Sequence, residues 1–334
     1  MGTYIARRLL QAGIIFLGLT VFFFFLLHIS PQDPCESIRE SSGLNVEQKY
    51  HACILRYGLD KPLPIQFFAW AGNVSHGDFG LTQEGEDVGS AILNRLPATL
   101  LLGGISYLIQ EIIALPLGIL GALKRYTFID QALTFFSYIW LSTPTFWLGV
   151  VAILIFAVKL NWVPPTGIVD FVRYPAFGTH DYWVALQQQP LPVIGDFLHH
   201  LIMPAIVLAI VGIGGDSRFM RASMLDVINQ DYIRTARAKG LPRRSVIYKH
   251  ALRNALLPVV TIVGSTIPLL IGGAIITEGI FSWPGIGLLF IHSLQTQNYN
   301  TLQALLLILA LAVLVGNVIT DVAYAVVDPR IRYS

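Results

Sequence analysis

Long apolar runs alternate with polar stretches along the whole chain. A helix needs about 20 predominantly apolar residues to cross the hydrocarbon core of a membrane, and most of these runs reach that length. The pattern therefore predicts an all-α membrane protein with six transmembrane helices. The expected spans are residues 9–29, 96–123, 131–158, 197–215, 255–277 and 302–327.

Two of these spans have features that should shape the bundle. The uncharged core of the fourth span, residues 201–215, is only 15 residues long, which is about 22 Å of helix. It must therefore take length from its flanks or tilt little. The third span has Pro144 near its middle. A proline frees a backbone carbonyl that neighbouring groups must satisfy, so we expect a kink within a packed bundle.

The polar stretches divide the chain into residues 1–96, one span followed by a large loop, and residues 97–334, a five-span core. The first apolar run is longer than that of a secretory signal and is followed by no small-residue cleavage site, so we expect the span to be retained. Within the loop, residues 57–80 predict a cap packed on the spans, and contact with substrate is the alternative. Its expected apolar face is formed by Ile65, Phe68 and Ala69.

Composition supports a membrane protein independently of the runs. Hydrophobic residues make up 54% of the chain, charged residues 13%, and the mean hydropathy is +0.63. These values lie far from the balance of a soluble domain, and they argue against a large soluble core.

Basic residues predict the orientation. Residues 226–258, which we call the elbow, form the only long polar segment in the second half of the chain. Lys and Arg accumulate in cytoplasmic loops. With the elbow and both termini in the cytoplasm, 15 of the 22 Lys and Arg residues lie on the inner side. Seven of them belong to the elbow: Arg234, Arg237, Lys239, Arg243, Arg244, Lys249 and Arg253.

The elbow itself predicts two short helices with a break. Tyr232, Ala236 and Gly240 follow one another at intervals of four residues, which places two very small side chains on one helical face. Gly240 suits a helix end, and Pro242 suits the first turn of the next helix. The face that carries Ala236 and Gly240 allows another surface to approach the backbone closely. In the second helix, Ile247, Ala251 and Ala255 are expected to share a face.

Cys35 and Cys53 are the two cysteines of the chain, and both fall in the predicted outer loop. An oxidising compartment would allow a disulfide between them, and two free thiols are the alternative. Two cysteines without a nearby histidine fall short of a four-ligand metal set, so no metal site is expected.

Three acidic residues lie within or next to the apolar runs: Glu111, Asp216 and Asp321. Charged groups in hydrocarbon are costly and are often functional. Asp216 and Asp321 are expected near the inner interface, where either can pair with an arginine of the elbow. Glu111 lies deepest, and it is the candidate for a role in the transport path.

Several stretches resemble the permease subunits of bacterial ATP-binding cassette (ABC) importers, in the dipeptide, oligopeptide and nickel branch. The coupling segment of that family has the pattern Glu-Ala-Ala, three residues, Gly. Here Arg234, Thr235 and Ala236 precede Gly240. The position that is glutamate in the family pattern is therefore an arginine in this chain, and a salt bridge made by that glutamate in other branches does not carry over. The other stretches are residues 57–80, RLPATLLLG (95–103), TPTFWLG (143–149), SWPGIG (282–287) and DPRIRY (328–333).

The resemblance implies a type I ABC importer permease fold with a cytoplasmic coupling helix, in the cytoplasmic membrane of a bacterium or archaeon. It implies import of peptides by alternating access, together with a second homologous permease, an extracytoplasmic substrate-binding protein and two cytoplasmic ATPase subunits. Surrounding membrane lipid completes the set of partners. The residues expected to couple to the ATPases are Tyr232, Arg234, Thr235, Ala236, Arg237, Lys239 and Gly240.

The chain has no Gly-Lys dipeptide, hence no GxxxxGK[ST] phosphate loop. We therefore expect no cofactor and no enzymatic activity of its own, with ATP and Mg²⁺ bound by the partner subunits.

Other functions leave weaker signals. Close relatives of the family carry nickel or other small solutes with the same set of subunits, so these solutes are alternative substrates. A secondary transporter usually has repeated halves, and no convincing repeat is found. An intramembrane metalloprotease would need an HExxH motif, which does not occur. Nucleic-acid binding is disfavoured because the basic residues are confined to one short loop between spans.

Overall fold

The computed structural model describes residues 2–29, 46–82, 85–256 and 275–327. Within these ranges the elements are helices, and Leu81 and Asp87 form an isolated β-bridge. The long helices are α1 (Gly2–Ile29), α5 (Val88–Leu123), α6 (Phe128–Ser142), α9 (Pro190–Ile228) and α15 (Tyr299–Val327). The shorter ones are α3 (Val46–Tyr57), α4 (Leu63–Ser75), α7 (Thr145–Ala152), η1 (Ile153–Lys159), α8 (His180–Gln188), α10 (Asp231–Ala238), η2 (Ser245–Ala251), α11 (Leu252–Ala255), α13 (Ile275–Ile280) and α14 (Ile286–Gln295).

In the described part of the chain, four helices are long and apolar enough to cross a membrane: α1, α5, α9 and α15. Helices α6 and α7–η1 make a fifth span if the two are counted together. The predicted span 255–277 lies largely outside the described residues. An all-helical membrane protein is thus confirmed, whereas the count of six spans stays a prediction.

Helices α5 and α9 pack closely along much of their length, and glycine makes this possible. A Cβ on Gly118 of α5 would lie 2.5 Å from the carbonyl oxygen of Ser217 on α9. On α9, a Cβ on Gly214 would lie 2.7 Å from the carbonyl oxygen of Ser137 on α6. Helices in lipid associate through such small residues because the backbones must approach closely. The result is a three-helix core of α5, α9 and α6.

The third predicted span is broken rather than kinked. Helices α6 and α7 meet at 95° across Thr143 and Pro144. Proline lacks a backbone N–H and disfavours helical geometry in the residue before it, and Thr143 is accordingly extended. The Thr143 hydroxyl donates to the carbonyl oxygen of Ile139 at 2.7 Å. This bond satisfies one of the acceptors that the break would otherwise leave open.

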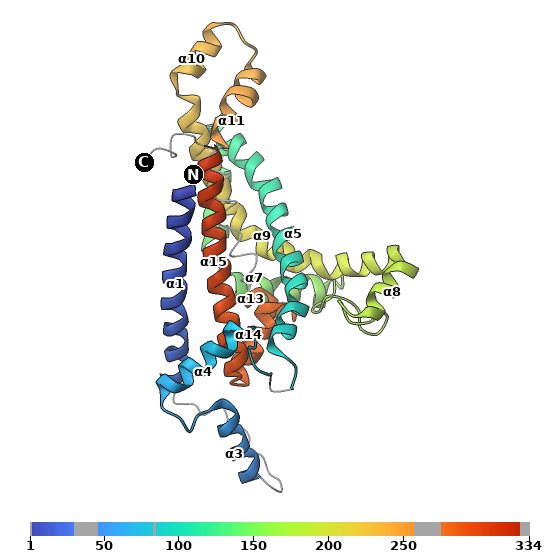
Figure 1. Ribbon diagram of the computed structural model, residues 1–334. Helices are drawn as coiled ribbons and strands as arrows, with labels where there is room; N and C mark the ends of the chain where they lie inside the picture. The colour runs from blue at the N-terminus through green and yellow to red at the C-terminus, as the bar shows by residue number, and fades with distance from the viewer. Residues whose placement is uncertain (1, 30–45, 83–84, 257–274, 328–334) are drawn as a thin grey trace.

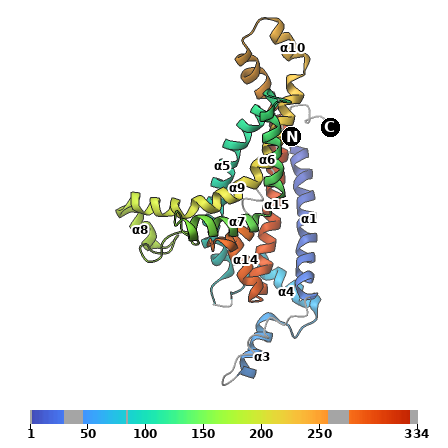
Figure 2. The same cartoon turned by 180° about the vertical axis from the view of Figure 1, so that it is seen from behind.

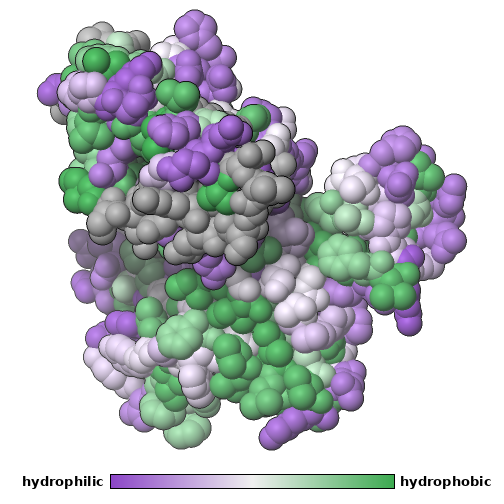
Figure 3. Space-filling view, turned by 90° about the horizontal axis from the view of Figure 1, so that it is seen from below, coloured by the Kyte–Doolittle hydropathy of each residue, from purple (hydrophilic) through white to green (hydrophobic). Residues whose placement is uncertain are grey.

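The fourth predicted span takes its length from both flanks. Helix α9 contains 39 residues, about 58 Å at 1.5 Å per residue, and this confirms that the 15-residue apolar core needed extension. Helix α8 and the adjoining start of α9 project sideways from the bundle (Figures 1 and 2). Viewed from below, hydrophilic side chains gather over the tip of this arm, while apolar side chains are exposed over the end of the bundle (Figure 3).

Helix α4 covers the end of α1, as the sequence predicted for the cap, but through a different face. The Phe24 ring of α1 lies 5.3 Å from the rings of Phe67 and Trp70 on α4. The predicted face is wrong, since Ile65, Phe68 and Ala69 are all exposed. Phe67 and Trp70 offer two aromatic rings to bury, whereas the predicted face has only that of Phe68. The cap is thus fixed by an aromatic cluster.

Candidate coupling site

The elbow leaves the bundle at the end of α9 and projects beyond the ends of the other helices (Figures 1 and 2). One face of it is nonetheless buried. A hydrophobic cluster joins the elbow to the ends of two long helices. The elbow contributes Ile233, Ala236, Val246, Ala251 and Ala255, helix α9 contributes Met220 and Met224, and helix α5 contributes Ala122. The elbow therefore rests on the ends of α5 and α9.

The two small residues of the elbow have different surroundings. Ala236 is only 7% exposed, because it is part of the hydrophobic cluster. At Gly240 the backbone has φ +74°, and a Cβ would meet nothing within 4 Å. This left-handed conformation, which favours glycine, confirms the predicted helix end. The chain itself fills the space beside Ala236, whereas the surface at Gly240 is open.

The remaining predicted coupling residues point away from the cluster. Arg237 and Lys239 are exposed, as are Tyr232 and Thr235. The Tyr232 hydroxyl accepts a hydrogen bond from the side-chain amide of Asn254 at 2.9 Å, which joins the two halves of the elbow. Arg234 lies 3.6 Å from Asp231, and both side chains are largely exposed. The elbow thus presents a basic outer face and buries an apolar inner face.

The second half of the elbow differs from the prediction in its register. Residues 245–251 form a π-helix, in which the backbone bonds follow an i to i+5 pattern. This spacing places Val246 and Ala251 on the same buried face, while Ile247 is only half-buried. Ile247 still packs against the cluster that contains Ala251 and Ala255, as expected, and Val246 joins the buried face because the backbone is not α-helical throughout.

An ion pair that the sequence did not suggest lies beside the elbow cluster. The Arg221 guanidinium of α9 donates to both carboxylate oxygens of Asp130 on α6, at 2.6 and 2.8 Å. The Tyr126 backbone N–H also donates to Asp130, at 2.9 Å. A bidentate pair is among the stronger polar contacts in proteins. It fixes the start of α6 to α9 at Arg221, directly after Met220 of the cluster.

The predicted partners of two membrane acids are wrong. Asp321 of α15 lies 3.2 Å from Arg8 of α1, and Asp216 of α9 accepts a hydrogen bond from Gln110 of α5. Among the described residues, neither acid is paired with an arginine of the elbow. The helices packed side by side offer nearer partners than the elbow, which stands beyond their ends.

Glu111 lies on α5 next to Gln110, with its carboxylate oxygens shielded from solvent near Asp216. Its suggested role in the path stays a prediction. So does the disulfide, because Cys35 lies outside the described residues and the side chain of Cys53 is not described.

At the opposite end of the bundle, two of the motifs noted in the sequence contact each other. Glu278 is fully buried and accepts hydrogen bonds from the Thr99 hydroxyl at 2.9 Å and the Gly287 backbone N–H at 2.6 Å. The Trp283 indole donates to the carbonyl oxygen of Ala98 at 2.8 Å. A Cβ on Gly285 would overlap both Glu278 Oε2 and Thr99 Oγ1. SWPGIG is therefore the surface that docks on RLPATLLLG.

Two family models match the chain over nearly its whole length. Residues 114–333 match the binding-protein-dependent transport system inner membrane component, and residues 1–103 match the N-terminal region of such membrane components. The chain belongs to this family. It is a multi-pass membrane component of a binding-protein-dependent transport system.

Relatives of this transport component match from end to end. The oligopeptide transport system permease protein AppB of Bacillus subtilis is 41% identical over 100% of both chains. The di/tripeptide transport system permease protein DppB of Pseudomonas aeruginosa is 38% identical, again over 100% of both. The dipeptide transport system permease protein DppB of Escherichia coli K12 is 37% identical over 99% of both.

Proposed function

We propose that this chain is the permease subunit of an ABC importer that carries peptides across a bacterial cytoplasmic membrane. The peptide substrate is taken from the relatives, which are named as oligopeptide, dipeptide and di/tripeptide permeases. The proposed partners are a second homologous permease, two cytoplasmic ATPase subunits that bind ATP and Mg²⁺, and an extracytoplasmic binding protein. The permease spans the membrane six times, with both termini in the cytoplasm.

One observation carries the coupling proposal: the elbow has an exposed basic face and a buried face that rests on two long helices. Ile233 and Ala236 pack against Met220 and Met224 of α9 and, through the same cluster, against the end of α5. A force on the outer face is therefore transmitted to the ends of α5 and α9 together. Rigid-body movement of packed helices is a common form of switching in proteins.

The Asp130–Arg221 pair extends this unit to α6. When the ATPases close on ATP, the elbow moves with them, and α5, α6 and α9 follow as one body. The path for peptide then opens alternately to the two sides of the membrane. The permease supplies no catalytic group to ATP hydrolysis; it supplies a contact whose position depends on the nucleotide state of the ATPases.

Substitution of Gly240 tests the contact. We expect Gly240→Val to remove most of the stimulation of ATPase activity by peptide-loaded binding protein, measured on the reconstituted importer, while the permease still inserts in the membrane. A valine has space within the chain, since nothing lies within 4 Å. Its side chain instead projects to the surface where the ATPase is proposed to sit.

Two further variants separate the contact from backbone strain. Gly77 has φ +83° and is equally open, so Gly77→Val introduces comparable strain, about 1–3 kcal/mol, without a proposed partner. Gly240→Asn adds bulk with less strain, because Asn tolerates the left-handed region. The proposal requires both Gly240 variants to lose stimulation and Gly77→Val to keep it. Normal stimulation in both Gly240 variants would exclude the elbow contact, and a defect in Gly240→Val alone would assign Gly240 to the helix end only.

A further inference from the structure

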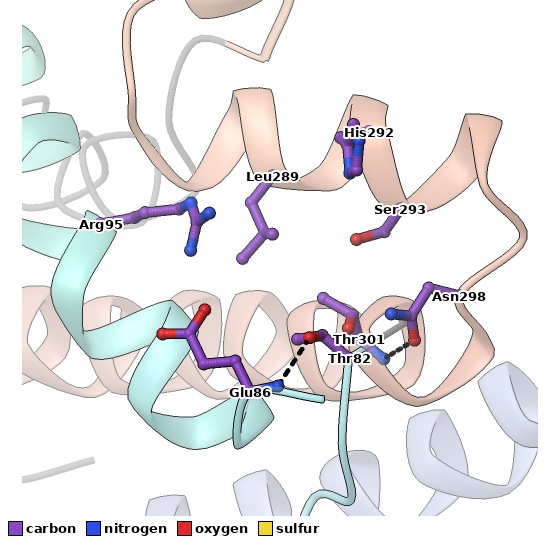
Figure 4. A pocket seen from close by; sticks show the side chains of 8 residues that line it. All are labelled: Thr82, Glu86, Arg95, Leu289, His292, Ser293, Asn298 and Thr301. Atoms are coloured by element: carbon purple, nitrogen blue, oxygen red, sulfur yellow. Dashed lines mark hydrogen bonds between the residues drawn. The ribbon is translucent and has the colours of Figure 1, made fainter. Parts of the chain in front are cut away.

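A cavity of about 190 Å³, lined mainly by polar and charged residues, lies at the end of the bundle opposite the elbow. Its walls come from the loop before α5, the start of α5, α14 and the start of α15 (Figure 4). The volume equals about six water molecules at ~30 Å³ each. It is therefore large enough for a small polar molecule and too small for a long peptide.

Two opposite charges face this cavity from different elements. Arg95 of α5 extends into the cavity, and the carboxylate of Glu86, an exposed residue of the preceding loop, lies on the same side as Arg95 (Figure 4). Within the described residues, Arg95 and Glu86 are not within 4.0 Å of each other, and no other carboxylate lies within 4.0 Å of Arg95. One Arg95 nitrogen, Nη1, donates to the carbonyl oxygen of Ala91 at 3.0 Å. The other donors of the guanidinium are left to face the cavity.

The floor of the cavity has a hydroxyl that the chain does not use. Thr301 is fully buried, and its Oγ1 has no hydrogen-bond partner in the part of the chain that the structure describes. Buried polar groups are nearly always hydrogen-bonded, so an unmatched hydroxyl on a cavity wall points to an external partner. Ser293, 2% exposed, lines the same wall from α14.

Hydrogen bonds fix the walls around these groups. The backbone N–H of Thr82 donates to the carbonyl oxygen of Glu86 at 2.8 Å, and the Glu86 N–H donates back to the Thr82 hydroxyl at 3.2 Å. The Thr301 N–H donates to Asn298 Oδ1 at 3.2 Å. Helix α14 is fixed in turn by Glu278. The cavity is therefore preformed, as small-ligand sites usually are.

We propose that this cavity binds a small zwitterion that has an α-ammonium and a carboxylate group. Its carboxylate pairs with Arg95 and accepts hydrogen bonds from the Thr301 and Ser293 hydroxyls, and its ammonium pairs with Glu86. Charge-assisted bonds of this kind are the stronger hydrogen bonds in proteins. A free amino acid or a dipeptide has this chemistry. The inference does not depend on the transport proposal, because it concerns binding to the isolated permease.

Binding of glycine and glycylglycine to the purified full-length permease in lipid nanodiscs tests the proposal, measured by saturation-transfer NMR. We expect saturable binding of at least one of them. The one that binds more tightly shows whether the site takes a free amino acid or a dipeptide. Arg95→Gln and Glu86→Gln should each weaken it by about tenfold or more, since bonds to charged groups contribute most. Thr301→Val should weaken it to a smaller extent.

Matched controls make the outcome decisive. Arg173→Gln removes an exposed arginine away from the cavity and should leave binding unchanged. N-acetylglycine lacks the ammonium and glycinamide lacks the carboxylate, so both should bind at least about tenfold more weakly. Absence of saturable binding to the wild type would overturn the proposal, as would equal binding of N-acetylglycine or full binding by folded Arg95→Gln protein. A cooperative thermal unfolding transition establishes that each variant is folded. If a variant is not folded, binding is measured on Ser293→Ala instead.

Discussion

Glu278 shows how much a single buried side chain can organise in this molecule. Its carboxylate is fully buried at the start of α14, where the N–H groups of Gly287 and Leu288 donate to it at 2.6 and 3.3 Å. Unpaired helix N–H groups and the helix dipole both favour a negative charge at this position. Thr99 donates from α5. The carboxylate thus holds α13, α14 and α5 together.

Replacement of Glu278 by glutamine should destabilise the protein. The amide places an NH₂ group where one carboxylate oxygen accepts, so at least one buried donor loses its partner. Bonds to charged groups contribute about 1.5–3 kcal/mol each, and we expect the free energy of unfolding to fall by about that amount. A lower midpoint of thermal unfolding of the purified protein would show it. Glu47→Gln, at an exposed position of α3, is the control, and equal midpoints for the two variants would contradict the role of Glu278.

The contrast between Gly240 and Glu278 shows which residue roles the sequence reveals. The helix end at Gly240 follows from its neighbours alone, and it is confirmed by the positive φ. Glu278 and Thr99 are 179 residues apart, so their contact depends on the packing of the whole bundle. SWPGIG and RLPATLLLG both stood out in the sequence as motifs. Neither motif indicated that the other was its partner.

Helices are the level at which the sequence was most informative. The apolar runs predicted α1, α5, α9 and α15, because a spanning helix needs a long uninterrupted apolar stretch. Two of the details that failed were local departures from α-helical geometry. Pro144 breaks the third span by 95°, and a π-helix shifts the register of the elbow. A hydrophobic pattern shows that a segment is buried, but not how its backbone bends.

The attachment of α6 to α9 rests on Asp130 and Arg221, and its loss should be costly. Asp130→Asn leaves a guanidinium without its charge partner, and breaking a buried pair typically costs 3–5 kcal/mol. Because the Arg221 side chain is 30% exposed, solvent screening reduces this value, and we expect about 2–3 kcal/mol. The free energy of unfolding of the purified permease measures the change.

Two comparisons isolate the charge effect at this helix contact. Asp231→Asn breaks the exposed pair with Arg234 and should cost less than about 1 kcal/mol. Replacing both partners, Asp130→Leu with Arg221→Met, should recover part of the loss, since an apolar pair leaves no unpaired charge. If Asp130→Asn were no more harmful than Asp231→Asn, α6 would have to be held by packing alone.

At the scale of the whole molecule, the ends of the bundle differ in charge and in architecture. The start of α1 and the end of α15 lie at the end that carries the elbow (Figure 1), and Arg8 and Asp321 join them there at 3.2 Å. Helices α4 and α14 lie at the opposite end (Figure 1), as does the cavity lined by Arg95 and Thr301. Seven basic residues in the elbow favour the cytoplasm for the first end.

This orientation makes a prediction about access from outside the cell. In a background with Cys35→Ser and Cys53→Ser, a membrane-impermeant maleimide added to intact spheroplasts should label Glu47→Cys on α3 and Asp181→Cys on α8, both exposed positions. Arg237→Cys in the elbow, also exposed, should be labelled only after the membrane is permeabilised. Labelling of Arg237→Cys in intact spheroplasts would place the elbow outside, where no cytoplasmic ATPase can reach it. The charge bias would then have failed, and the coupling proposal would fail with it.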